Sequence, residues 1–181
     1  MSRSSTNRTN PLTKDQIGEF FSDHLPYRLS MLYSFKDIQW NDIAAKCHIS
    51  NSTIYDLMIC CCEASRISSR MFIQFMGLGI NSNGELKEKR DYFLSSDKKS
   101  YEVKIIDLGG KWVSLNDLTD KENDLLAKTY ETASKATAHL TYGDPHGGEP
   151  RILNDGSELI LRLLKEYLYD IVGVDLKNKL L

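Results

Sequence analysis

The sequence predicts an all-α fold: an up-and-down helical bundle around one long central helix, with a small β-hairpin insertion. The first observation is that apolar residues recur at helical spacing within residues 50–77. This stripe comprises Ile54, Leu57, Met58, Cys61, Phe72, Phe75 and Met76. The second observation is a band of further apolar residues off the stripe, at Ile59, Ile67 and Ile73. A helix that is apolar on more than one side is usually buried between neighbours. Residues 50–77 are therefore expected to form one unbroken helix that is among the most buried elements.

Three shorter helices are expected before the central one. Thr13 and Gln16 have the spacing of a capping box, which opens the first helix. That helix is expected to end near His24, because Pro26 disfavours helical backbone at the residue before it. Pro26 in turn suits the first turn of a second helix. Residues 40–48 form a third, short helix.

The segment after the central helix changes character twice. Residues 81–100 are polar and highly charged, which indicates a loop. Two short β-prone runs then flank Gly109 and Gly110. Such runs on either side of a glycine pair are typical of a tight hairpin, so the β-hairpin is expected at residues 101–115.

Two more helices complete the predicted bundle. Each opens with the spacing of a capping box, a Thr or Asp followed three residues later by Glu. The first is expected from Thr119 to about residue 140, and the second from Asp155 to Gly173. Residues 142–150 between them are rich in glycine and proline and are expected to form a loop.

Length and composition indicate one globular domain. The chain has 181 residues, is 41% apolar and 27% charged, and carries a formal net charge of −2. Residues 1–12 are expected to be a flexible N-terminal tail, residues 13–173 a single helical-bundle domain, and residues 174–181 a C-terminal tail. No apolar run approaches the roughly 18 residues of a membrane span, and the N-terminus lacks the apolar core of a secretory signal. A cytoplasmic protein that does not bind membranes is expected.

The cysteines and the glycine-rich loop do not predict a metal site. The four cysteines are Cys47, Cys60, Cys61 and Cys62. Consecutive cysteines on a helix point in different directions, so they cannot close a tetrahedral zinc site by themselves. They are expected to be small, buried, reduced residues. The loop contains Asp144, His146 and Glu149, and these also need further ligands. No metal and no cofactor are expected.

Residues 42–57, DIAAKCHISNSTIYDL, resemble the helix-turn-helix of bacterial regulators. The resemblance implies that Ser52 and Tyr55 lie at the start of a recognition helix that enters the major groove of DNA. His48 stands where a glycine usually makes the turn. The alternative is that this segment is the capped start of the central helix and binds no DNA.

Residues 134–143, SKATAHLTYG, come late in a long predicted helix. Together with a mostly helical chain of this length, they resemble the bacterial HEPN superfamily of helical bundles, whose members often cut RNA or act in defence systems. The family motif is an Arg followed after four to six residues by His. Here Lys135, rather than an Arg, stands four residues before His139. These two residues are the only catalytic candidates, and no catalytic residue is assigned. The alternative for His139 is a histidine that bonds a carbonyl at the helix end.

Arg66 and Arg70 lie four residues apart on the polar side of the central helix. Together with Ser52 and Tyr55 they are the candidate residues for binding nucleic acid or a partner. The alternative is a salt-bridged face, because Glu63 is placed to pair with Arg66.

The function expected from the sequence is a non-catalytic or divergent HEPN-like helical module. It would bind RNA or a protein partner, in a prokaryotic defence or toxin-type system. A second copy of the same chain, forming a homodimer, is one candidate partner. Two alternatives stay open. One is a DNA-binding transcriptional regulator that uses residues 42–57, and the other is a plain helical interaction protein.

Overall fold

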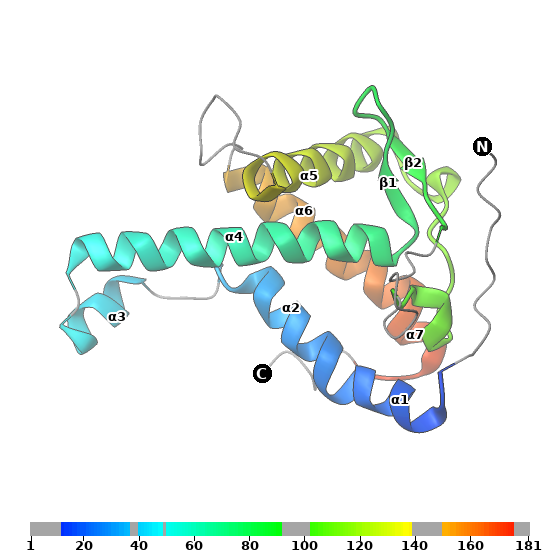
Figure 1. Ribbon diagram of the computed structural model, residues 1–181, viewed down its shortest axis with the longest axis horizontal. Helices are drawn as coiled ribbons and strands as arrows, with labels where there is room; N and C mark the ends of the chain where they lie inside the picture. The colour runs from blue at the N-terminus through cyan, green and yellow to red at the C-terminus, as the bar shows by residue number, and fades with distance from the viewer. Residues whose placement is uncertain (1–11, 37–39, 49, 92–101, 139–149, 176–181) are drawn as a thin grey trace.

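One long helix, α4 (Asn51–Phe75), forms the axis of the molecule (Figure 1). The computed structural model describes residues 12–36, 40–48, 50–91, 102–138 and 150–175. Around α4 pack the helices α2 (Leu25–Tyr33), α5 (Asp120–Ala138) and α6 (Pro150–Leu164). This architecture confirms the all-α bundle around one central helix. None of the described helices combines the length and the apolar composition needed to cross a membrane.

The central helix is unbroken, as predicted. At its start the side chain of Ser50 accepts a hydrogen bond from the backbone N–H of Thr53, at 3.2 Å. At its end Met76 is the C-cap residue, and Gly77 has a positive φ of 84°. The aromatic ring of Trp112 occupies the space that a side chain on Gly77 would need. The chain therefore leaves the helix at a position that only glycine fits.

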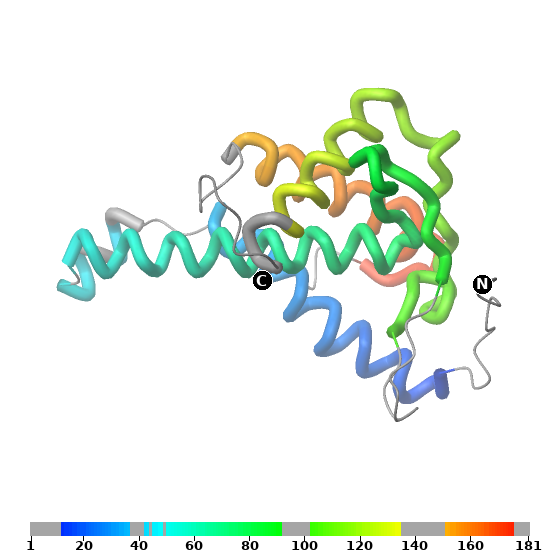
Figure 2. The backbone as a smooth tube through the Cα atoms, turned by 45° about the horizontal axis from the view of Figure 1, so that its top comes forward, coloured from blue at the N-terminus to red at the C-terminus, as the bar shows by residue number. Residues whose placement is uncertain are grey.

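Helix α4 joins the main core through its C-terminal half, and in its first half Ile54 is the buried member of the apolar stripe. Phe72 and Ile73 in the C-terminal half are completely buried, whereas Leu57 and Met58 in the first half are 41% and 38% exposed. The expectation that the whole helix would be among the most buried elements was therefore wrong for its first half. The reason is visible in Figures 1 and 2, where α2, α5 and α6 cover the C-terminal part of α4 and the N-terminal part projects beyond them.

The N-terminal segment is a continuous helical path rather than two separate helices. Helix α1 (Lys14–Glu19) begins with the predicted capping box of Thr13 and Gln16. It runs through a π-helical turn, η1 (Phe20–His24), directly into α2. The expected end near His24 was therefore wrong. Proline crowds the carbonyl of the preceding turn, and the wider π-helical turn accommodates this inside a helix.

The β-hairpin lies earlier in the chain than predicted. Strand β1 (Leu78–Ile80) follows the central helix directly and pairs antiparallel with β2 (Leu86–Glu88), which lies within residues 81–100, the stretch expected to form a loop. Their turn is built by Asn81, whose side-chain oxygen accepts hydrogen bonds from the backbone N–H groups of Asn83 and Glu85. Gly84 then supplies a positive φ of 81°.

The glycine pair predicted to turn a hairpin has another role. The chain before it forms a short 3-10 helix, η2 (Ile105–Leu108), which Gly109 ends in a left-handed conformation. Gly110 lies so close to the backbone carbonyl of Tyr167 that a side-chain carbon would fall 2.6 Å from that oxygen. The next residue, Lys111, donates its N–H to the same carbonyl at 2.9 Å. The glycine therefore permits close packing against the C-terminal helix.

The remaining elements agree with the sequence except at one helix start. The short helix α3 (Trp40–Cys47) and the capping box of Thr119 with Glu122 are confirmed. A second 3-10 turn, η3 (Leu115–Asp117), precedes α5. Helix α6 begins at Pro150, five residues before the expected start, because proline suits a first helical turn. The helical path continues through a π-helical turn and ends at Gly173, as predicted. These last elements are η4 (Lys165–Tyr169) and α7 (Asp170–Val172).

Candidate functional site

A two-helix projection stands out from the body of the protein. It consists of α3 and residues 51–64 of α4, and we call it the arm (Figures 1 and 2). Along its α4 side chains, Tyr55 is 56% exposed, Leu57 41% and Met58 38%. Leu57 and Met58 belong to the same helical stripe that is buried further along α4. The arm therefore carries an extension of the core stripe to the surface.

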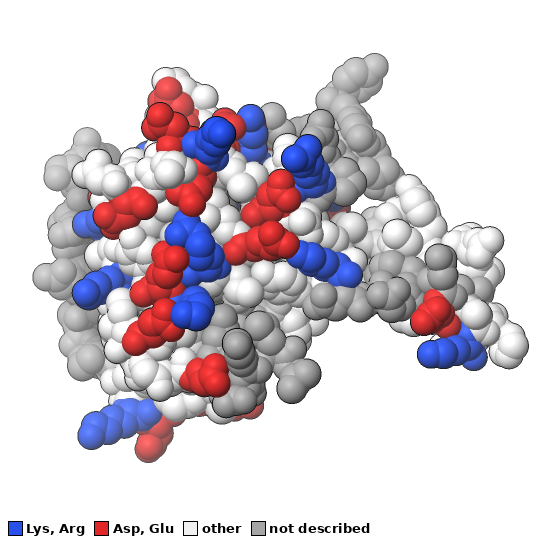
Figure 3. Space-filling model, turned by 180° about the vertical axis from the view of Figure 1, so that it is seen from behind, with Lys and Arg blue, Asp and Glu red and all other residues white. Residues whose placement is uncertain are grey.

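The arm is poor in charge, and the few charges are mostly acidic. Residues 40–64 contain Lys46 as their one Lys or Arg, against Asp42, Asp56 and Glu63. Figure 3 shows the arm from behind as a largely uncharged projection. Nucleic-acid binding depends mainly on Lys and Arg that neutralise phosphates. This charge balance weighs against phosphate binding by the arm.

The structure places Ser52 and Tyr55 at the tip of the arm, on the first turns of α4. α3 and α4 are joined through His48, which has a positive φ of 53°. That is the left-handed conformation that glycine adopts most easily, so His48 takes the place of a turn glycine. Unlike a short recognition helix, α4 then continues without a break into the core.

Arg66 and Arg70 lie between helices. Arg66 is only 7% exposed and forms an ion pair with Glu63. The guanidinium of Arg70 lies over the ring of Tyr130 on α5, 5.4 Å from its centroid. The hydroxyl of Tyr130 in turn accepts a hydrogen bond from Gln74 at 2.8 Å. Arg70 therefore belongs to the α4–α5 interface, and Arg66, buried and paired with Glu63 on its own helix, is largely withdrawn from any ligand.

The catalytic candidates cannot be placed. His139 and the side chain of Lys135 lie outside the described residues, as do the metal-capable groups of the loop 142–150. Comparisons with models of protein families, with curated proteins and with solved structures find no match. The HEPN-like resemblance therefore remains a prediction from the sequence.

The cysteines are less buried than expected. Cys47 and Cys60 are exposed, and Cys61 and Cys62 are half-buried. Burial raises the pKa of the thiols of Cys61 and Cys62, which disfavours the thiolate form that nucleophiles and metal ligands need. Within the described ranges, no group of three or more His, Cys, Asp or Glu side chains is arranged to hold a metal ion.

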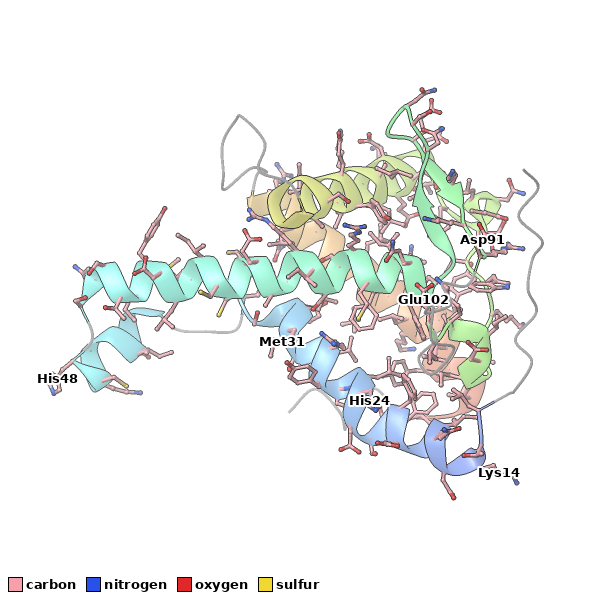
Figure 4. All side chains as sticks on the ribbon, in the orientation of Figure 1. Lys14, His24, Met31, His48, Asp91 and Glu102 are labelled. Carbon is pink, nitrogen blue, oxygen red and sulfur yellow. The ribbon has the colours of Figure 1, made fainter. Side chains whose placement is uncertain are left out.

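Sequence reasoning missed a cavity of about 280 Å³ on the opposite part of the molecule. It lies between the N-terminal helices and the C-terminal half of α4, and residues 102–103 help to line it. Its polar lining comes from His24, Arg28 and Glu102, of which Figure 4 labels the first and last. The spacing of His24 and Arg28, four residues apart, is visible in the sequence. Their meeting with Glu102 depends on the tertiary fold.

Proposed function

We propose that this protein is a non-catalytic helical interaction module that pairs with a second copy of itself through the arm. The observation that carries this proposal is the exposure of Leu57 and Met58, two members of the apolar stripe, on a helix whose later turns form the core. Exposed apolar side chains cost free energy in water, and contiguous patches of them commonly mark interaction surfaces.

A second copy fits the shape of the arm. Two helices alone cannot enclose an apolar stripe, but two such pairs related by a two-fold axis form a four-helix cluster. In this arrangement each stripe meets its own copy. The acidic side chain of Asp56 and the basic side chain of Lys46 give the arm charges of both signs, so they allow cross-pairing between copies.

The arm offers a small interface. Residues 51–64 span about 21 Å at the rise of an α-helix, and two helices side by side are about 20 Å wide. A face of this size covers about 420 Å² before side-chain relief is counted, about half of the roughly 800 Å² that each partner buries in a standard interface, so the pair is expected to be of the small, weaker kind.

The test measures the mass of the purified protein in solution by light scattering after gel filtration, over a range of concentrations. We expect a dimer for the parent and a monomer for Leu57→Glu, because a two-fold interface would bury the new charge twice. Ile67→Glu is the matched control, since Ile67 is 50% exposed on the same helix outside the arm. A parent that stays monomeric at about 100 μM, or an Ile67→Glu variant that dissociates equally, contradicts the proposal.

DNA reading by the arm is the second candidate, and the positive φ of His48 is the observation that favours it. The acidic balance of residues 40–64 weighs against it. Fluorescence anisotropy with mixed duplex DNA separates the two. Binding that weakens with salt and is lost in Tyr55→Ala supports DNA reading, and its absence leaves the protein partner as the function.

A further inference from the structure

The cavity beside α2 has a floor that suits an apolar ligand. Of the apolar lining residues, Phe72 is completely buried behind the floor, Leu25 and Phe75 are 4% and 8% exposed, and Phe20 and Met71 are half-buried. The rings of Phe72 and Phe75 meet edge to face, with centroids 6.4 Å apart and an interplanar angle of 82°. Rings arranged in this way offer a rigid apolar surface to another flat ring or a short aliphatic chain.

Within the described part of the chain, one positive charge at the rim has no carboxylate partner. Among the described residues Arg28 forms no ion pair, and its guanidinium lies over the ring of Tyr27, 5.3 Å from the centroid. Most of the other described arginines form ion pairs. The ion-paired basic residues include Lys36, Arg66, Arg90, Lys104, Lys128, Arg151, Arg162 and Lys165. Figure 3 shows the resulting mixture of basic and acidic groups over the back of the protein.

The other polar groups of the rim already have partners. The imidazole of His24 packs against the ring of Phe20 at a tilt of 42°, with centroids 4.7 Å apart, and its Nε2 lies 3.7 Å from Oε1 of Glu19. The carboxylate of Glu102 lies 2.6 Å from Nζ of the buried Lys104. Arg28 is therefore the charge that a ligand would neutralise.

From this juxtaposition we propose that the cavity binds a small monocarboxylate that carries an aromatic or short aliphatic group. The carboxylate pairs with the guanidinium of Arg28, whose planar fork matches its two oxygens. The apolar group lies against Phe75 and the half-buried side chains of Phe20 and Met71. At about the 30 Å³ that a water molecule occupies in the liquid, the cavity has room for roughly ten non-hydrogen atoms. A single unpaired guanidinium balances one negative charge, which favours a carboxylate over a doubly charged phosphate ester.

The test uses calorimetric titration of the full chain with phenylacetate, which has the required charge and size. Three related compounds define the class: 2-phenylethanol without the charge, phenyl phosphate with a second charge, and acetate without the ring. We expect phenylacetate to bind more tightly than all three, and to raise the Tm of the protein through linkage.

Two variants of Arg28 test whether its guanidinium binds the carboxylate of the ligand. Arg28→Gln is expected to weaken phenylacetate binding by about tenfold to a hundredfold, the range for a hydrogen bond to a charged group, and Arg28→Lys by less. Lys14→Gln is the matched control, because Lys14 is exposed on the same helical path and does not line the cavity (Figure 4). Equal binding of the neutral alcohol, tighter binding of phenyl phosphate, an unchanged affinity in Arg28→Gln, or no binding of phenylacetate up to about 5 mM each overturns the proposal.

Discussion

Replacing Phe72 by alanine tests whether the second half of α4 carries the core. Phe72 is completely buried and packs edge to face against Phe75. Aromatic-to-alanine changes in cores cost about 3–5 kcal/mol, part from lost transfer free energy and part from the cavity left behind. Because Phe72 also lines the existing cavity, part of the vacated space opens to solvent. We therefore expect a loss of about 3 kcal/mol in the free energy of unfolding, near the lower end of this range.

The assay is denaturant unfolding followed by circular dichroism, with Ile67→Ala as the control. Ile67 lies on the same helix but is 50% exposed, and alanine favours helix more than isoleucine does. Its replacement is expected to change the free energy of unfolding by less than about 0.5 kcal/mol. Phe72→Leu, expected to cost about 1.5 kcal/mol, keeps the test possible if the alanine variant does not fold. A loss below about 1 kcal/mol for Phe72→Ala, or an equal loss for Ile67→Ala, would refute the placement of the core.

Two further substitutions probe the end of α4. Gly77→Ala should lower the free energy of unfolding, measured by thermal unfolding, by about 1–3 kcal/mol. The residue has a positive φ, and the new methyl group would meet the ring of Trp112. Lys104→Met should cost about 1.5–3 kcal/mol, because it removes the charge-assisted hydrogen bond of 2.9 Å from the buried ammonium to the carbonyl of Gln74; an unchanged denaturation midpoint would contradict this.

The helices were largely predictable from local signals, and the hairpin was not. The caps at Thr13 and Thr119 are short-range hydrogen-bonding patterns that the structure reproduces. The strand β2, in contrast, has the sequence Leu-Lys-Glu and is largely exposed, so it lacks the alternation that marks a strand. Its turn depends on the side chain of Asn81, which a polar segment does not distinguish from an ordinary loop.

Glycines were the main source of error, because tertiary contacts determined their role. Gly110 was interpreted as a turn residue, yet the nearby backbone of Tyr167 requires it. Gly156 lies within α6, and Thr129 on α5 occupies the space that a side chain there would need. Asp155 and Glu158 on either side of it have the spacing of a capping box, which explains why α6 was expected to begin too late.

The candidate surfaces were only partly accessible from sequence for a similar reason. The apolar stripe on α4 was identified correctly, but its period is the same whether neighbours cover it or not. Only the lengths and packing of α2 and α5 determine that Leu57 is exposed while Phe72 is buried. The cavity likewise joins Arg28 to Glu102, which are far apart in the chain.

Tyr169 provides a test in which removing a polar atom should stabilise the protein. Its ring is 1% exposed and meets that of Phe21 edge to face, with centroids 5.7 Å apart. Within the described part of the chain its hydroxyl has no hydrogen-bond partner. Burying such a group costs about 1–3 kcal/mol, so Tyr169→Phe should raise the free energy of unfolding by about 1 kcal/mol at pH 7 while keeping the ring in place.

The same hydroxyl makes the free energy of unfolding depend on pH. Burial raises the pKa of Tyr169 to about 12, above its ordinary value of 10.0. Below pH 10 both folded and unfolded chains keep the proton, and between pH 10 and 12 the unfolded chain loses it first. Stability therefore falls as the pH rises through this window, and Tyr169→Phe should show a shallower fall.

Tyr167 is the contrasting control, because burial and then its hydrogen bond to Asp117 raise its pKa to about 12 as well. Tyr167→Phe should flatten the same window but lose stability at pH 7, because it gives up that hydrogen bond. If denaturant titrations show that Tyr169→Phe is also less stable at pH 7, the hydroxyl has a partner in solution and the argument from its isolation fails.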